Sequence, residues 1–235
     1  MQSNNSSQSD SGAGSVLTRL RALLPDRPLG LQEAVSIIEL QAARLLHFQG
    51  ISDAPVPTAA VSELPRVTVV ADHDLTRHAA SGTSHWSRQR QAWIISVNPS
   101  EPLTRQRFTV VHEYWHIIMH YHPGLRGPLP TAIFGLDPVE YLAEYFAGCV
   151  LMPKRWLKSA FYAGVQQTDD LAALFHVSPR AVEVRLCQLG LQNLAEKKPQ
   201  GTRYRLQTAD WHRRDGSPRL PYRRAAAGRQ LQEVA

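Results

Sequence analysis

The chain has 235 residues, of which 43% are hydrophobic and 20% are charged, a composition typical of a globular protein with a sizeable core. No run approaches the roughly 18 consecutive apolar residues of a membrane span. The first residues lack the basic-then-apolar pattern of a secretory signal. Because the chain has only two cysteines, we expect no disulfide framework and a cytoplasmic location.

The net charge of +6 is concentrated at the C-terminus. Residues 197–235 contain ten Lys or Arg and three Asp or Glu, a net charge of +7, whereas the other residues carry sixteen positive and seventeen negative charges, a net charge of −1. The composition therefore gives no reason to expect the folded part to bind nucleic acid, although weak nucleic-acid contact by the basic tail stays open.

The N-terminal third of the chain is predicted to contain a disordered segment followed by a helix. Residues 1–15 are rich in Ser, Asn, Gln and Gly and have little to bury, which is typical of disorder. From Leu31 to Phe48 apolar residues recur at helical spacing, and Gly50 follows as a helix end. Residues 58–64 are predicted to add a short connecting turn or helix.

The helical spacing of apolar residues then ends, and the segments that follow are predicted to form strands. Residues 66–70 and 92–97 are rich in β-branched and aromatic residues. A middle strand or hairpin is expected within the polar residues 75–91, and Asn98-Pro99 ends the last strand.

The rest of the chain is predicted to be helical. A long helix begins at residues 100–102, or at Thr104, and continues to about His120. Asp137 as an N-cap and Pro138 at the first position begin another helix, which ends near Met152. Shorter helices are expected at residues 154–162 and on both sides of a break at residues 177–179.

The long helix carries the run His112-Glu113-Tyr114-Trp115-His116. Residues four apart lie on the same face of a helix, so His112 and His116 can both bind one ion, and Glu113 lies beside them where it can reach a water. This spacing is typical of a zinc peptidase, in which the glutamate is the general base. The neighbouring residues are apolar, and polar side chains in a buried helix need partners.

A catalytic zinc ion takes three protein ligands. The helix that begins at Asp137 presents Glu140 and Glu144 on one face, and we assign Glu140 as the third ligand. Glu144, one turn further, is predicted to accept a hydrogen bond from a ligand histidine. The alternative for Glu144 is a solvated side chain. His120, Tyr121 and His122 follow the histidine pair and are candidates for contact with an oxyanion or with substrate.

Several segments resemble the ImmA/IrrE family of metallopeptidases. The resemblance covers about residues 30–195, and it is carried by residues 93–98, 105–120, 140–147, 150–153 and 171–191. It implies an α+β, zincin-like fold, with a small twisted antiparallel or mixed sheet packed on the active-site helix. It also implies one zinc ion bound by His112, His116 and Glu140, with Glu113 as the base.

The resemblance extends to the domain order and to the partner. We expect a disordered segment at 1–16, a metallopeptidase domain at 17–165, a helix-turn-helix-like subdomain at 166–195 and a poorly ordered basic tail at 196–235. Family members often act on a helix-turn-helix repressor of mobile elements or stress genes. Two residues depart from the family pattern: Trp115 replaces a usual glycine and would narrow the cleft, and Glu144 replaces a usual asparagine and adds charge near the metal.

These features predict hydrolysis of a peptide bond in a regulatory protein. Glu113 takes a proton from water and returns it to the leaving amine. The strand at residues 92–97 is expected to offer an edge to which an extended substrate adds. Two alternatives stay open: a DNA-binding or repressor-binding regulator with a non-catalytic zinc ion, and a scaffold that binds a repressor without cutting it.

Overall fold

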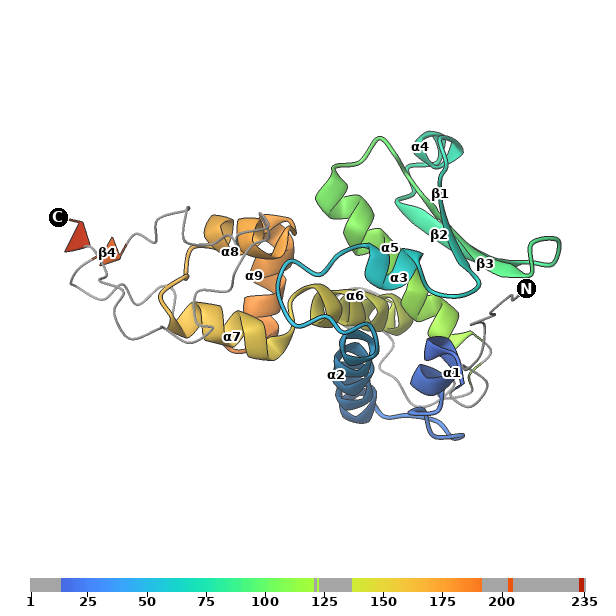
Figure 1. The fold of residues 1–235 in the computed structure, drawn as a ribbon, viewed down its shortest axis with the longest axis horizontal. Helices are drawn as coiled ribbons and strands as arrows, with labels where there is room; N and C mark the ends of the chain where they lie inside the picture. The colour runs from blue at the N-terminus through green and yellow to red at the C-terminus, as the bar shows by residue number, and fades with distance from the viewer. Residues whose placement is uncertain (1–13, 121, 123–136, 192–202, 205–232, 235) are drawn as a thin grey trace, which may run out of the picture.

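The computed structural model describes residues 14–120, 122, 137–191, 203–204 and 233–234. It has a mixed α+β fold with a small three-stranded sheet, and helices precede and follow the sheet strands in the sequence (Figure 1). The predicted fold class, an α+β protein with a small mixed sheet on a long helix, is confirmed. Within the described residues, no helix is long and apolar enough to cross a membrane.

Three helices precede the sheet. Helix α2 (Leu31–Phe48) agrees with the predicted range, and the short α3 (Ala59–Ser62) lies in the predicted connection. Helix α1 (Val16–Arg21) was not predicted, because six residues are too few to show a helical period. The guanidinium of Arg21 donates to the carbonyls of Ile117 (2.6 Å) and Ile118 (3.1 Å) and so caps the end of the long helix that carries His112 and His116.

The sheet consists of β1 (Val67–Ala71), β2 (Gly82–Ser87) and β3 (Ala92–Val97), in the order β1-β3-β2, and the short α4 (Asp74–Arg77) connects β1 to β2. Strand β3 pairs with β1 in parallel and with β2 in antiparallel register. The prediction that β3 offers an open edge is therefore wrong: β3 is the central strand, with its backbone groups paired on both sides. The middle strand expected within residues 75–91 is β2.

Helix α5 (Leu103–Met119) packs against β2, β3 and helix α6 (Pro138–Leu151), and α6 also packs against α2. Helix α5 ends one residue before the predicted end, with His120 as its C-cap. Its buried residues lie on several faces because it separates the sheet from the other helices. Helix α5 is therefore the central element of the fold.

The last helices are α7 (Lys154–Tyr162), α8 (Thr168–Phe175) and α9 (Pro179–Gln188), close to the predicted ranges. Ser178 caps α9 by accepting from the amide of Ala181 (3.2 Å). Arg185 of α9 is fully buried and donates to Glu39 of α2 (3.0 Å), which also accepts from the Tyr145 hydroxyl (2.8 Å). An ion pair therefore links α9 to α2. Two short paired strands, β4 (Arg203–Tyr204) and β5 (Glu233–Val234), are described in the basic tail.

Candidate metal centre

The α-helical period of α5 brings the side chains of His112 and His116 together. Their Nε2 atoms lie 3.1 Å apart, and their side chains are 15% and 24% exposed. Two ring nitrogens at this distance point at one location, as the four-residue spacing predicted.

Helix α6 brings Glu140 to the same location. The side chain of Asp137 accepts from the amide of Val139 (2.8 Å), and Pro138 occupies the first turn, so the start of α6 is well defined. Glu140 lies in this first turn, where its Oε2 is 3.2 Å from His112 Nε2 and its Oε1 is 3.4 Å from His116 Nε2. The packing of α6 on α5 therefore joins residues that are 24 positions or more apart in the sequence.

The three side chains are close enough to bind a metal ion, since one ligand atom from each lies within 4.8 Å of the others. In a tetrahedral site with bonds of about 2.0–2.1 Å, ligand atoms lie roughly 3.3 Å from one another. The two histidine nitrogens are 3.1 Å apart, and each lies 3.2–3.4 Å from a different oxygen of Glu140, which is close to this spacing. Two imidazoles and one carboxylate also leave one coordination position for a water or a substrate.

The environment of His112 favours its neutral form, which is the form that binds a metal. Burial, followed by the nearby His116 and Arg105, lowers the pKa of His112 to about 3. At neutral pH the imidazole of His112 is therefore already neutral, and its nitrogen lone pair can bind a metal ion without first releasing a proton.

Glu113 lies beside this cluster and faces the sheet. It is 8% exposed, and its Oε2 accepts a hydrogen bond from the hydroxyl of Ser84 on β2 (2.9 Å). Burial raises the pKa of the Glu113 carboxyl above its usual value, while the bond from Ser84 opposes the shift. The carboxylate is thus held in one orientation next to the candidate ligands.

Sequence reasoning missed two residues that support Glu113. Ser84 had no local signal, because a serine in a polar strand is common. Gly82 falls within the polar residues 75–91, where a glycine is common, but a Cβ on it would lie 2.3 Å from Thr109 Cγ2, 2.9 Å from the Ser96 carbonyl oxygen and 3.4 Å from Glu113 Cγ. Only glycine lets β2 approach α5 this closely.

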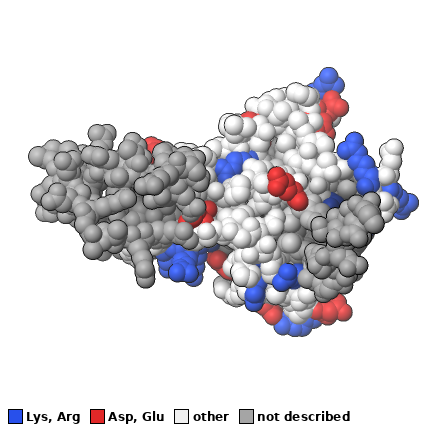
Figure 2. All heavy atoms as spheres, in the orientation of Figure 1, with Lys and Arg blue, Asp and Glu red and all other residues white. Residues whose placement is uncertain are grey.

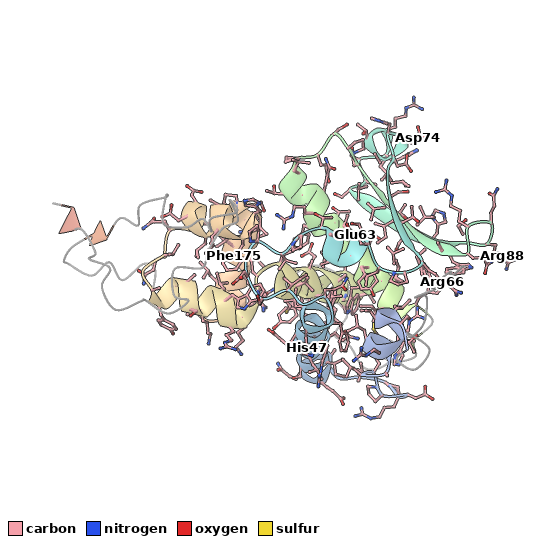
Figure 3. All side chains as sticks on the ribbon, in the orientation of Figure 1. His47, Glu63, Arg66, Asp74, Arg88 and Phe175 are labelled. Carbon is pink, nitrogen blue, oxygen red and sulfur yellow. The ribbon has the colours of Figure 1, made fainter. Side chains whose placement is uncertain are left out.

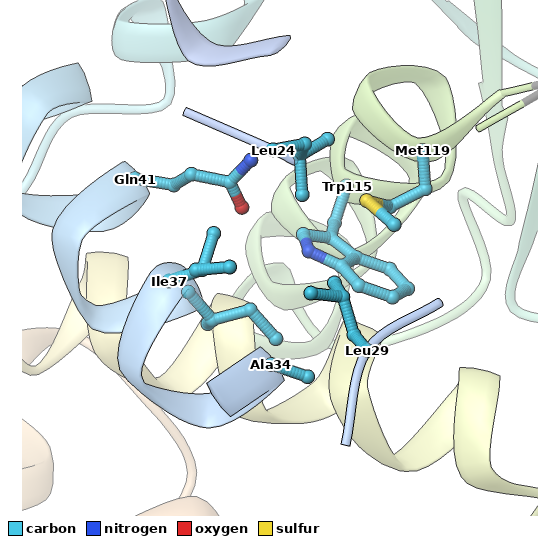
Figure 4. Close-up of a pocket in the computed structure, with 8 residues that line it drawn as sticks. Leu24, Leu29, Ala34, Ile37, Gln41, Trp115 and Met119 are labelled. Atoms are coloured by element: carbon cyan, nitrogen blue, oxygen red, sulfur yellow. The ribbon is translucent and has the colours of Figure 1, made fainter. Parts of the chain in front are cut away.

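The expectation that Trp115 narrows the cleft is wrong. Its ring is 1% exposed and fills the core between α5 and α2, where it lines a cavity of about 10 Å³ with Leu24, Leu29, Gln41 and Met119 among others (Figure 4). The helical period turns position 115 away from the ligand face, and the apolar face of α2 receives the indole.

The other candidates lie around the cluster without joining it. Glu144 is half-buried one turn after Glu140, burial raises its pKa, and it makes no hydrogen bond to either histidine among the described residues. Its predicted bond to a ligand histidine stays a prediction. His120 is exposed, with its ring 4.7 Å from that of Trp93, and His122 is half-buried. Tyr121 lies outside the described residues.

A mixed α+β fold, in which two helices bring two histidines and a carboxylate within metal-binding distance, defines a candidate metalloprotein. Residues 68–187, just over half of the chain, match the model of a peptidase family described as the IrrE N-terminal-like domain. The chain belongs to this family, as its sequence motifs predicted.

Other comparisons add a distant likeness. Among solved structures, a Mycobacterium tuberculosis transcriptional regulator is 20% identical with a TM-score of 0.47, over 73% of this chain and 51% of that one. This chain therefore spans about half the length of that structure. No curated protein matches the chain.

Proposed function

We propose that this protein is a zinc-dependent metallo-endopeptidase of the zincin type that cuts a regulatory protein, such as a helix-turn-helix repressor, in the cytoplasm. The observation that supports this best is the joint arrangement of His112, His116 and Glu140 with the buried carboxylate of Glu113 beside them. A structural metal site is usually closed by four protein ligands, whereas three ligands and an adjacent base are typical of hydrolysis.

Zinc is the metal that this ligand set suits best, since imidazole and carboxylate ligands at tetrahedral spacing are its common partners. When bound, it would supply Lewis acidity, which acidifies a coordinated water and stabilises negative charge on the scissile carbonyl. His112, His116 and Glu140 would hold it.

Glu113 is the proposed general base. It would accept a proton from the attacking water and deliver it to the leaving amine. Ser84 holds Oε2 of this carboxylate, which leaves Oε1 to exchange the proton. The apolar residues around α5 exclude other water from the back of the site.

Strand β2 provides the open edge for the substrate, in place of β3. In the described residues, β2 pairs only with β3. The amide of Asn98 donates to the carbonyl of Ser81 (2.9 Å), and hydrogen-bonded pairs alternate along an antiparallel ladder. Gly82, Ser84 and Trp86 therefore have backbone groups that face away from β3, and an extended peptide could pair with them next to Glu113.

The alternative of a DNA-binding regulator is less well supported. Helices α8 and α9 pack together in a helix-turn-helix-like pair, which we propose as the subdomain at 166–195. Of its two arginines, however, Arg185 is buried against Glu39 and Arg180 is paired with Glu183 (3.1 Å). Burial closes Arg185 to a phosphate, and Arg180 is the one exposed arginine of the two helices, so we propose a structural role for this helix pair. Contact between the tail and nucleic acid remains a separate proposal.

The test combines metal content with cleavage of the repressor encoded beside the gene. The metal-loaded protein should cut it, a chelator should stop the reaction, and Glu113→Gln should keep its zinc but cut about 10²–10⁴-fold more slowly. Glu63→Gln, an exposed carboxylate outside the site, is the matched control. A Glu113→Gln protein that binds zinc and cuts at the native rate would refute the mechanism. Binding of the repressor without fragments would favour a scaffold.

A further inference from the structure

Three arginines gather at one end of the sheet. Arg88 and Arg90 lie in the four-residue turn between β2 and β3, and Arg66 directly precedes β1 at the same end; we call these residues the arginine tip. All three are exposed, and Figure 3 labels Arg66 and Arg88 at this end of the sheet. Blue side chains project there at the right of Figure 2.

No ion pair neutralises the arginine tip among the described residues. None of its guanidinium groups makes a hydrogen bond or salt bridge there, in contrast to Arg77, which pairs with Asp74 (3.2 Å) at the other end of the sheet. Between positions 75 and 100 the sequence has no Asp or Glu. The field around Arg88 and Arg90 is therefore positive, although the chain outside the tail carries a net charge of −1.

The arginine tip is continuous with the open edge of β2. Ser84 touches Glu113, and Arg88, the first residue after the end of β2, lies four residues further along the chain, which is at most about 13 Å at 3.3 Å per residue. A peptide that pairs with the β2 edge and passes Glu113 would reach the arginines roughly three to six residues from its reacting bond.

From this geometry we propose that the arginine tip selects substrates with acidic side chains on one side of the cleaved bond. The proposal rests on the proposed function. Carboxylates on an extended segment would meet the arginines in sequence, and Arg binds carboxylates with two parallel hydrogen bonds.

Nucleic acid is the less favourable occupant. A protein that binds a duplex through its phosphates commonly makes six to ten such contacts. The arginine tip offers three cations, and two of them, Arg88 and Arg90, follow the end of the β2 edge, which is suited to a peptide backbone.

The first experiment measures binding, so that it does not depend on turnover. Zinc-loaded Glu113→Gln protein is titrated against fluorescent peptides that share a neutral β-branched centre and carry either aspartates or asparagines on one flank. Two pairs place the charges on the N-terminal or the C-terminal flank. We expect the aspartate peptide of one pair to bind about threefold to tenfold more tightly, and the difference to shrink as salt rises.

Variants then locate the preference. Arg88→Gln with Arg90→Gln should abolish it, and Arg88→Glu with Arg90→Glu should shift it to a lysine-flanked peptide. Arg77→Gln, an exposed arginine at the far end of the sheet, should leave it unchanged. Equal binding of all peptides, or a preference that survives both double substitutions, overturns the proposal. Displacement of the peptide by duplex DNA, with loss of DNA binding in the double variant, overturns it in favour of nucleic acid.

Cleavage by the wild-type protein separates this proposal from the proposed function. If the preferred peptide is cut faster than its asparagine partner, both stand. If the peptides are cut at equal rates, the selectivity is wrong and the peptidase stands. If neither these peptides nor the repressor is cut while the charge preference in binding persists, the peptidase is wrong and the acid-binding surface stands.

Discussion

Replacement of Gly82 by alanine should push β2 away from α5 and disturb the support of Glu113. The new Cβ would lie 2.3 Å from Thr109 Cγ2 and 2.9 Å from the Ser96 carbonyl oxygen. Carbon atoms in contact normally lie about 3.5–4.0 Å apart, so more than an ångström of separation is missing. Thr109 is buried and Ser96 belongs to the central strand, so neither can move freely.

Overpacking of this kind costs about 1–3 kcal/mol. For a chain of this size, that corresponds to a fall in Tm of roughly 2–12 °C. The peptidase activity should fall as well, since the shift of β2 lengthens the 2.9 Å bond from Ser84 to Glu113. Differential scanning calorimetry and repressor cleavage measure the two effects.

A glycine in a helix supplies the matched control. A Cβ on Gly148 of α6 would meet Arg185 Cδ at 3.7 Å, an ordinary contact. Gly148→Ala should therefore be neutral or stabilising by up to about 1 kcal/mol, the usual gain in a helix interior. Thr109→Ser removes the atom nearest to the new Cβ, so the Gly82→Ala, Thr109→Ser double variant should be more stable than the sum of the single effects predicts. A Gly82→Ala protein that melts at the wild-type temperature would refute the close approach of β2.

Three further predictions concern the ligands, the core and the cysteines. Zinc at about 100 times its Kd should stabilise the wild-type protein by about 2.7 kcal/mol in thermal melts, and an equal gain in Glu140→Ala would refute its role as a ligand. Arg185→Met should cost about 3 kcal/mol in urea unfolding, because Glu39 loses its partner, and the added change Glu39→Gln should recover part of it; additive losses would contradict the pairing. In the native protein, a thiol reagent should modify the exposed Cys187 well before the buried Cys149, whose pKa burial raises to about 12; mass spectrometry should identify the modified residue, and early labelling of Cys149 would contradict its burial.

Features that depend on residues close together in the sequence were predictable. The helices α2, α5, α6 and α7 follow from apolar spacing and from end signals such as Asp137-Pro138, which act within one helical turn. The His112–His116 pair follows for the same reason. Glu140 could be proposed from its residue type and its helix, but its distance from the histidines depends on the packing of α6 on α5.

Features that depend on contact between distant segments were not predictable. The strand order is one: residues 92–97 are the last of the three strands in the sequence but the central one in the sheet. The direction of Trp115 is another, because it depends on the apolar face of α2, more than 60 residues earlier. The capping of α5 by Arg21 likewise joins residues that are 96 and 97 positions apart.

The sequence alone determined the residue types of the candidate centre and the helices that carry them, since both depend on backbone hydrogen bonds over four residues. The tertiary structure decided which groups meet. It brought Glu140 within 3.4 Å of the histidines, placed Ser84 against Glu113 and left β2 as an edge strand that leads to the arginine tip. These contacts follow from burial of apolar surface on both faces of α5. The free energy of that burial depends on core residues from the whole chain, so no local sequence pattern can predict it.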